Sequence, residues 1–86
     1  MVKIDAIVKN ETGLHARPAV KLVNLCKTYQ SNIILQSGER SCDAKSIFKL
    51  LQCCIKKGET ITICAEGEDE SEAAKNVAKL IDALEG

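Results

Sequence analysis

Pro18 is the only proline in the chain, and it limits where the first helix can begin. Proline has no N–H and its ring clashes with the preceding helical turn, so it is tolerated mainly in the first turn of a helix. Gly13 precedes it and supplies the backbone freedom that a sharp turn needs. The sequence therefore predicts a turn at Gly13, followed by a helix over about residues 16–27.

His15, the only histidine, lies between this turn and this helix, at or beside the N-cap. A helix N-terminus carries partial positive charge and unpaired N–H groups, which favour a neutral imidazole and attract anions such as phosphate. Arg17 adds a guanidinium that can hold phosphate oxygens in a bidentate way. A nucleophile and an anion site are thus predicted in one turn. A lone histidine near a helix start is, however, more often a partly exposed residue without chemistry.

The rest of the chain alternates between the periods of strands and helices. Apolar residues alternate over 2–8 and 60–65, a second strand begins at Ile33, and 40–43 reads as a short polar edge strand. Helical stretches follow over 47–53, with Ser46 as N-cap, and over 70–84, with an apolar stripe. The order predicts an α+β open-faced β-sandwich, βαββαβα, with a four-stranded antiparallel sheet and three helices on one face.

Two positions in these elements carry sharper expectations. The strand over 60–65 should be the most central, with Ile61, Ile63 and Ala65 facing inward. In the helix over 47–53, Leu50 and Leu51 should face the core, which leaves Phe48, together with Ile47, partly exposed near Leu14. Exposed apolar residues beside a reactive histidine would form a docking surface.

Length and composition exclude several function classes. The 86 residues allow one domain, 1–86, with a single small core. Twelve basic and twelve acidic residues cancel, and Tyr29 and Phe48 are the only aromatic residues, so a nucleic-acid partner is not expected. No apolar run is long enough to span a bilayer and the N-terminus has no signal-peptide pattern, so we expect no membrane partner and a cytoplasmic location.

The cysteines are odd in number and have no framework spacing. Cysteine occurs at positions 26, 42, 53, 54 and 64, and without a secretion signal disulfides are not expected. The absence of a C-x-x-C motif argues against a metal site. The neighbours Cys53 and Cys54 should point apart on a helix, which argues against a redox pair between them. Five thiols nevertheless keep a small thiol- or metal-handling protein as an alternative function.

Three segments resemble one known family. They are Gly13-Leu14-His15-Ala16-Arg17-Pro18-Ala19, Ala44-Lys45-Ser46-Ile47-Phe48-Lys49-Leu50 and Ala65-Glu66-Gly67-Glu68-Asp69-Glu70. Together they resemble the histidine-containing phosphocarrier proteins of the bacterial phosphoenolpyruvate-dependent sugar phosphotransferase system. The resemblance implies the open-faced sandwich and a carrier, not an enzyme, that needs no cofactor. His15 would accept a phosphoryl group from enzyme I, held by Arg17 and by backbone N–H groups near Ala16 and Arg17, and pass it to sugar-specific enzyme IIA domains.

The same resemblance implies a surface for brief contacts with these partners. Its expected members come from the start of the first helix and from the second helix: Leu14, Val20, Lys27, Ile47, Phe48, Lys49 and Leu51. Ser46 matches a serine that a dedicated kinase phosphorylates in some bacteria, although Phe48-Lys49-Leu50 looks more like the branch without that kinase. Cys53-Cys54 stands where the family usually has a glycine, so the end of this helix is in doubt.

Two further expectations concern assembly and pathway. We expect a monomer. A paralogue serving a nitrogen-related or purely regulatory phosphorelay would share the chemistry and differ in its partners, so it remains an alternative to the sugar branch.

Overall fold

The seven elements follow one another in the predicted order, β-α-β-β-α-β-α. The computed structural model describes residues 1–84, so the last two residues of the predicted domain lie outside the described part. The elements are β1 (Val2–Ile7), α1 (Arg17–Cys26), β2 (Asn32–Ser37), β3 (Arg40–Asp43), α2 (Ile47–Cys53), β4 (Thr60–Glu66) and α3 (Glu70–Ala83).

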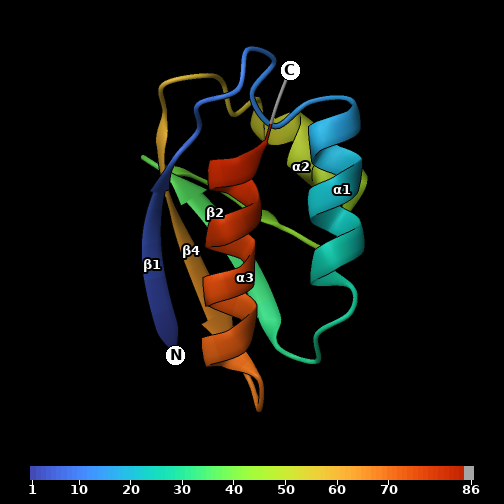
Figure 1. Cartoon of the computed structure of the whole chain (residues 1–86), viewed down its shortest axis with the longest axis vertical. Coiled ribbons are helices and arrows are strands. Elements are labelled where there is room, and N and C mark those ends of the chain that lie inside the picture. Colours follow the sequence, from blue (N-terminus) through green and yellow to red (C-terminus); the bar gives the residue numbers. More distant parts are fainter. Residues whose placement is uncertain (85–86) are drawn as a thin grey trace.

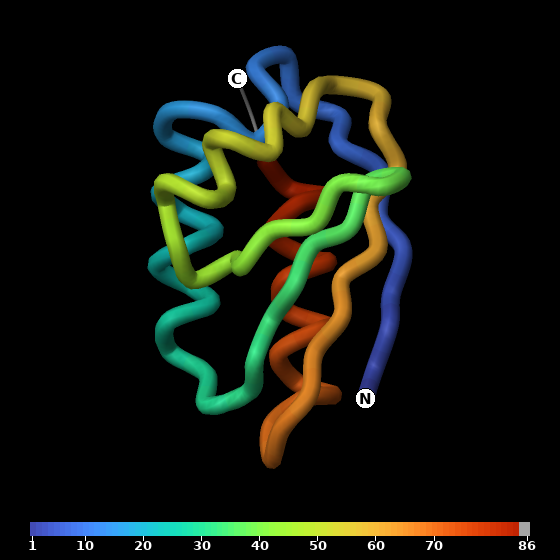
Figure 2. Tube along the Cα trace, turned by 180° about the vertical axis from the view of Figure 1, so that it is seen from behind, coloured from blue at the N-terminus to red at the C-terminus, as the bar shows by residue number. Residues whose placement is uncertain are grey.

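The four strands form one antiparallel sheet in the order β1-β4-β2-β3. Strand β4 is an inner strand, as predicted, but it shares this position with β2. Its Ile63 lies opposite Ile4 of β1 on one side and Leu35 of β2 on the other. The short polar β3 is an edge strand, also as predicted. All three helices lie on one face of the sheet (Figure 1), and the other face is left uncovered when the molecule is seen from behind (Figure 2). The predicted fold class is confirmed.

The core lies between the sheet and the helices, and the periodic apolar residues fill it. Strand β4 contributes Ile61, Ile63 and Ala65, all fully buried, as the alternation predicts. The helices add their apolar stripes, which are Ala19, Leu22, Val23 and Cys26 from α1 and Ala73, Ala74, Val77 and Ile81 from α3. Burial of this apolar surface is the main favourable term in folding, so the helices are held on the sheet chiefly by these residues.

In α2, the apolar periodicity predicted the burial of the side chains only in part. Ser46 caps α2, because its Oγ accepts a hydrogen bond from the N–H of Lys49 at 3.4 Å. Leu50 is fully buried, but Leu51 is only half-buried. Phe48 is 76% exposed, which confirms the expected exposure. Within residues 1–84, the structure contains no helix that is both long and apolar enough to cross a membrane.

Candidate functional site

The turn before α1 packs against the loop that follows α2. Gly13 has a φ of 65°, a conformation that favours glycine, and a Cβ at this position would lie 2.4 Å from the carbonyl oxygen of Ile55. The N–H of Leu14 donates to that same oxygen at 3.0 Å. The glycine therefore serves both the backbone conformation and a close approach between two chain segments.

Asn10 fixes the other side of this turn, and sequence reasoning missed its role. Its side-chain Nδ2 donates to the carbonyl oxygen of Gly13 at 2.6 Å. The backbone carbonyl oxygen of Asn10 accepts from the N–H of Gly13 at 3.1 Å. The side chain is buried although it is polar. A signal was available, since asparagine before a glycine turn often bonds to the backbone a few residues on.

His15 is exposed and directly precedes the first turn of α1. Ala16 is the N-cap, with a φ of 56°, and Arg17, also exposed, is the first helical residue. The first helical bond runs from the N–H of Val20 to the carbonyl of Ala16 at 3.2 Å. The N–H groups of Arg17 and Ala19 therefore have no acceptor within the helix, and Pro18 has no N–H to satisfy. The predicted placement of His15 beside the N-cap is confirmed.

This arrangement has a definite chemical capacity. An imidazole can act as a nucleophile through a neutral ring nitrogen, and unpaired N–H groups at a helix N-terminus stabilise an anion. The guanidinium of Arg17 comes from the same turn. The site thus offers a nucleophile, backbone donors and a cation within residues 15–19, and the His15 and Arg17 side chains are both exposed.

Beside this turn, a shallow hollow separates α1 from α2. It has a volume of about 170 Å³ and is lined by Val20, Val23, Asn24, Lys27 and Ile47. Three residues of the expected docking surface therefore meet there, Val20, Lys27 and Ile47. Val20 is 48% exposed, so apolar surface is available at its edge.

Other expected members of the docking surface do not share this hollow. Leu14 is only 1% exposed and belongs to the core, so its assignment to the docking surface was wrong. Its N–H donates to the carbonyl oxygen of Ile55, which holds this residue against the loop after α2. Lys49 lines a different hollow, beside β3. Leu51 is half-buried and packs against the core.

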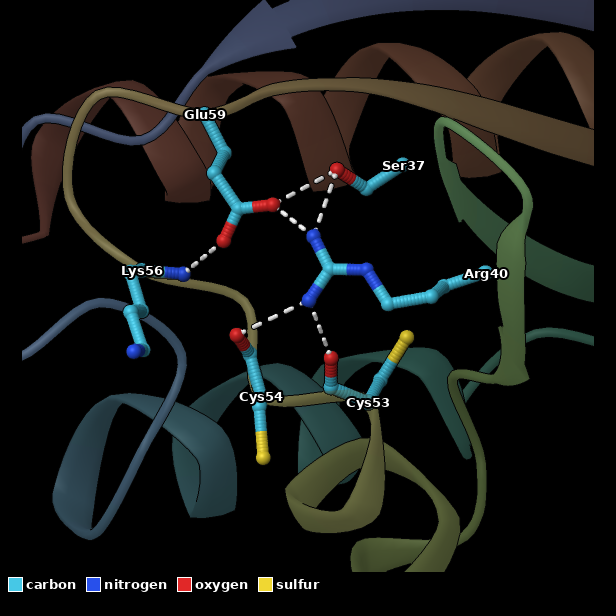
Figure 3. A network of polar contacts seen from close by, with 6 residues as sticks. All are labelled: Ser37, Arg40, Cys53, Cys54, Lys56 and Glu59. Atoms are coloured by element: carbon cyan, nitrogen blue, oxygen red, sulfur yellow. Dashed lines mark hydrogen bonds and ion pairs between the residues drawn. The ribbon is translucent and has the colours of Figure 1, made fainter.

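A polar network closes the end of α2 and supports the loop under Gly13 (Figure 3). Nη1 of Arg40 donates to the carbonyl oxygens of Cys53 at 2.7 Å and Cys54 at 3.1 Å. Nη2 of Arg40 donates to the carboxylate of Glu59, which also accepts from the N–H of Lys56 and, at 2.8 Å, from Oγ of Ser37. The bond from Lys56, followed by those from Ser37 and Arg40, holds the pKa of Glu59 below its usual range.

Among residues 1–84, no group of three or more histidine, cysteine or acidic side chains is arranged to hold a metal ion. The five cysteines are free thiols, and only Cys54 is exposed.

Comparison with known proteins gives one consistent result. The family model "PTS HPr component phosphorylation site" matches residues 2–83. The Phosphocarrier protein HPr of Borreliella burgdorferi is 44% identical over 84 residues, which cover 98% of each chain. The crystal structure of HPr from Thermoanaerobacter tengcongensis superposes with a TM-score of 0.93 at 35% identity, covering 96% of this chain and 93% of that one. A crystal structure of an HPr dimer from the same organism superposes with a TM-score of 0.76 at 35% identity, covering 96% and 95%. The chain therefore belongs to the HPr family of phosphocarrier proteins of the phosphotransferase system.

Proposed function

We propose that this protein carries a phosphoryl group on His15, accepting it from phosphorylated enzyme I and passing it to sugar-specific enzyme II components. The observation that carries the proposal is the exposed imidazole immediately before the unpaired N–H groups of α1. The family supplies the phosphocarrier role, and this geometry supplies an acceptor for it. We place the exchange in the cytoplasm, where phosphoenolpyruvate is made.

The chemistry follows from what the turn contains. A ring nitrogen of His15 forms a bond to phosphorus while the bond from phosphorus to the donor breaks. The backbone N–H groups of Ala16, Arg17 and Ala19 and the Arg17 guanidinium stabilise the negative charge on the phosphoryl oxygens. A phosphoramidate keeps a high transfer potential, because imidazole leaves readily once it is protonated. The group therefore moves on to the next acceptor, and the protein acts as a stoichiometric carrier, not as an enzyme.

Phosphorylation with purified components tests this proposal. Incubation with phosphoenolpyruvate and enzyme I should add one phosphate that is labile in acid and stable in base. The His15→Ala variant should remain unmodified, and the Arg17→Ala variant should be modified more slowly. Phosphate that is retained in His15→Ala, or wild-type protein that stays unmodified beside an active control HPr, would exclude His15 as the acceptor.

Partners should dock on the surface formed by Val20, Ile47, Phe48 and Leu51, with Lys27 and Lys49 at its edge. The exposure of Val20 and Phe48 and the hollow between α1 and α2 support this assignment. Lysines at the edge favour acidic partners and raise the rate of encounter. A carrier must release each partner quickly, so a small interface with a dissociation constant of the order of micromolar is expected.

The exposed ring of Phe48 provides the sharpest test of this surface. Phe48→Ala should lower the second-order rate of transfer from enzyme I by about 10-fold, because an aromatic anchor often dominates a small interface. Thermal unfolding should change little, since the ring is 76% exposed. Ile7→Ala is the matched control, because Ile7 is 52% exposed but lies on β1. Equal rates for Phe48→Ala and Ile7→Ala would remove Phe48 from the docking surface.

Ser46 remains a proposed second phosphorylation site. Its hydroxyl caps α2, one residue before Ile47 of the docking surface. A phosphate there would add negative charge beside the surface that receives acidic partners, so transfer from enzyme I should slow. Incubation with an HPr kinase/phosphorylase and ATP tests this: modification of wild type but not of Ser46→Ala supports the site, and no modification of either excludes it.

We propose that the working form is a monomer. His15 lies directly before α1, and the proposed docking residues come from α1, its C-cap Lys27 and α2. A single chain therefore supplies a complete site. Light scattering during size-exclusion chromatography should give the mass of one chain. A mass of two chains would match the dimer known for the relative from Thermoanaerobacter tengcongensis instead.

A further inference from the structure

Two buried cysteines from different elements meet away from the His15 turn. Cys42 lies in the edge strand β3 and is 6% exposed, and Cys53 is the last residue of α2 and is 7% exposed. Both side chains line the same hollow, between β3 and α2, which pack against each other.

Reagents from solvent have a route to this pair. Both cysteines line a hollow of about 660 Å³ on the β3 side of α2, together with Arg40, Ser41, Lys49 and Gln52. Since β3 is an edge strand, no neighbouring strand covers its outer side. The hollow is large enough to admit a small-molecule disulfide.

The neighbouring Cys54 is not part of the pair. Figure 3 shows the sulfur of Cys53 on the side of Arg40, whereas the sulfur of Cys54 points away from it. Cys54 is exposed and its thiol lies 3.6 Å from the carbonyl oxygen of Leu51. The structure therefore separates one exposed thiol from two buried thiols that line the same hollow.

We propose that Cys42 and Cys53 are a modification site, at which a small-molecule disulfide oxidises the two thiols to an internal disulfide. The Cys53 thiolate first attacks the small disulfide, forming a mixed disulfide and releasing one thiolate. The Cys42 sulfur then attacks Cys53, forming the Cys42–Cys53 bond and releasing the second thiolate. The two protons lost by the cysteines go to the two released thiolates, so the reagent is reduced by two electrons.

Burial determines the order and the rate of these steps. Burial, followed by the neighbouring Cys53 thiol, raises the pKa of the Cys42 thiol to about 12, so Cys42 is protonated at neutral pH and enters second. The reaction is accordingly slow compared with modification of an exposed thiol. Once formed, the bond ties β3 to the last turn of α2 and closes a loop that contains the whole of this helix.

Peptide mapping of the intact protein after exposure to oxidised glutathione tests the proposal. Trypsin cleaves after Arg40, Lys45, Lys49 and Lys56, so Cys42 is released in peptide 41–45 and Cys53 in peptide 50–56. Mass spectrometry should show these two peptides joined, with the loss of two hydrogen atoms. In Cys54→Ala, which lacks the exposed thiol, the thiols titrated in denaturant should fall from four to two, and dithiothreitol should restore all four.

Single variants identify the partners. Peptide 50–56 also contains Cys54, so the joined peptides should persist in Cys54→Ala and disappear in Cys53→Ala and Cys42→Ala. Cys64→Ala is a control that should behave as wild type. The proposal is overturned if the joined peptides persist in Cys53→Ala, if wild type forms only a mixed disulfide at Cys54, or if the cross-link joins two chains. Because the wild-type map is decisive by itself, a variant that fails to fold leaves the test intact.

Discussion

Cys54 shows how one residue can hold a backbone conformation that its side chain disfavours. It ends α2 with φ and ψ of 53° and 47°, in the left-handed region, where glycine is usual at the end of a helix. Cys54→Gly should therefore raise the free energy of unfolding by about 1 kcal/mol, measured by urea denaturation. Cys54→Ala removes the sulfur but keeps the Cβ, so it should give no gain. Equal effects of the two substitutions would mean that the thiol, and not the backbone, sets the stability.

The same residue illustrates what sequence could and could not reveal at this scale. A cysteine in place of the family's glycine put the end of α2 in doubt, yet the structure keeps the left-handed turn. The turn at Gly13 was predictable because glycine is the residue that such a turn requires. The positive φ of Ala16 was not, since alanine carries no signal for it. The burial of Leu14 was missed because it depends on a contact with residue 55, far along the chain.

At the scale of elements, Arg40 connects β3 to the end of α2. Arg40→Ala leaves the carbonyl oxygens of Cys53 and Cys54 and the carboxylate of Glu59 without this donor. The Arg40 side chain is 45% exposed, so water can replace some of the lost hydrogen bonds. The free energy of unfolding should therefore fall by only about 1–2 kcal/mol. Arg40→Lys, which keeps one charge but not the planar fork, should lose an intermediate amount.

Hydrogen exchange shows which elements lose stability in Arg40→Ala. Amide protection should fall most in the last turn of α2, and the strands β1 and β4 should keep theirs, because the hydrogen bonds of the Arg40 side chain reach no residue of either strand. A uniform loss of protection over all elements would indicate that Arg40 acts on global stability only. Sequence reasoning assigned Arg40 to a polar strand but could not find this network, since its members are brought together only by the fold.

At the scale of the whole molecule, the pattern of apolar and polar residues was sufficient to predict the architecture. The periods of β4 and α3 predicted their buried faces, and the polar sequence of β3 predicted its place at an edge. These features depend on residues near each other in the chain. Features formed by segments that are separate in sequence, such as the hollow shared by Cys42 and Cys53 or the close approach of Gly13 to Ile55, have no local signature and needed the structure.

Asp69 is a distant contact of this kind, and it makes the stability of the molecule depend on pH. Its carboxylate accepts from the N–H groups of Gln30 at 3.0 Å and Ser31 at 2.9 Å, and from the Ser31 hydroxyl, so it joins the start of α3 to the entry of β2. The bond from the Ser31 side chain, followed by that from the Gln30 N–H, lowers the pKa of Asp69. A lowered pKa contributes stability above the unfolded value, about 3.9, and this stability is lost as pH falls through the folded value.

Asp69→Asn should therefore destabilise the protein clearly at pH 7 and less at pH 2, because the wild-type carboxyl is protonated to a greater extent as the pH falls. Urea denaturation of both proteins at the two pH values measures the difference. Glu59 and Glu70 also have lowered pKa values, the latter through the amino group of Met1, so the variant should keep part of the acid sensitivity. Glu68→Gln changes an exposed acid next to Asp69 and serves as the control, with little effect at either pH. An equal loss at pH 7 and pH 2 would show that Asp69 acts through its shape, not its charge.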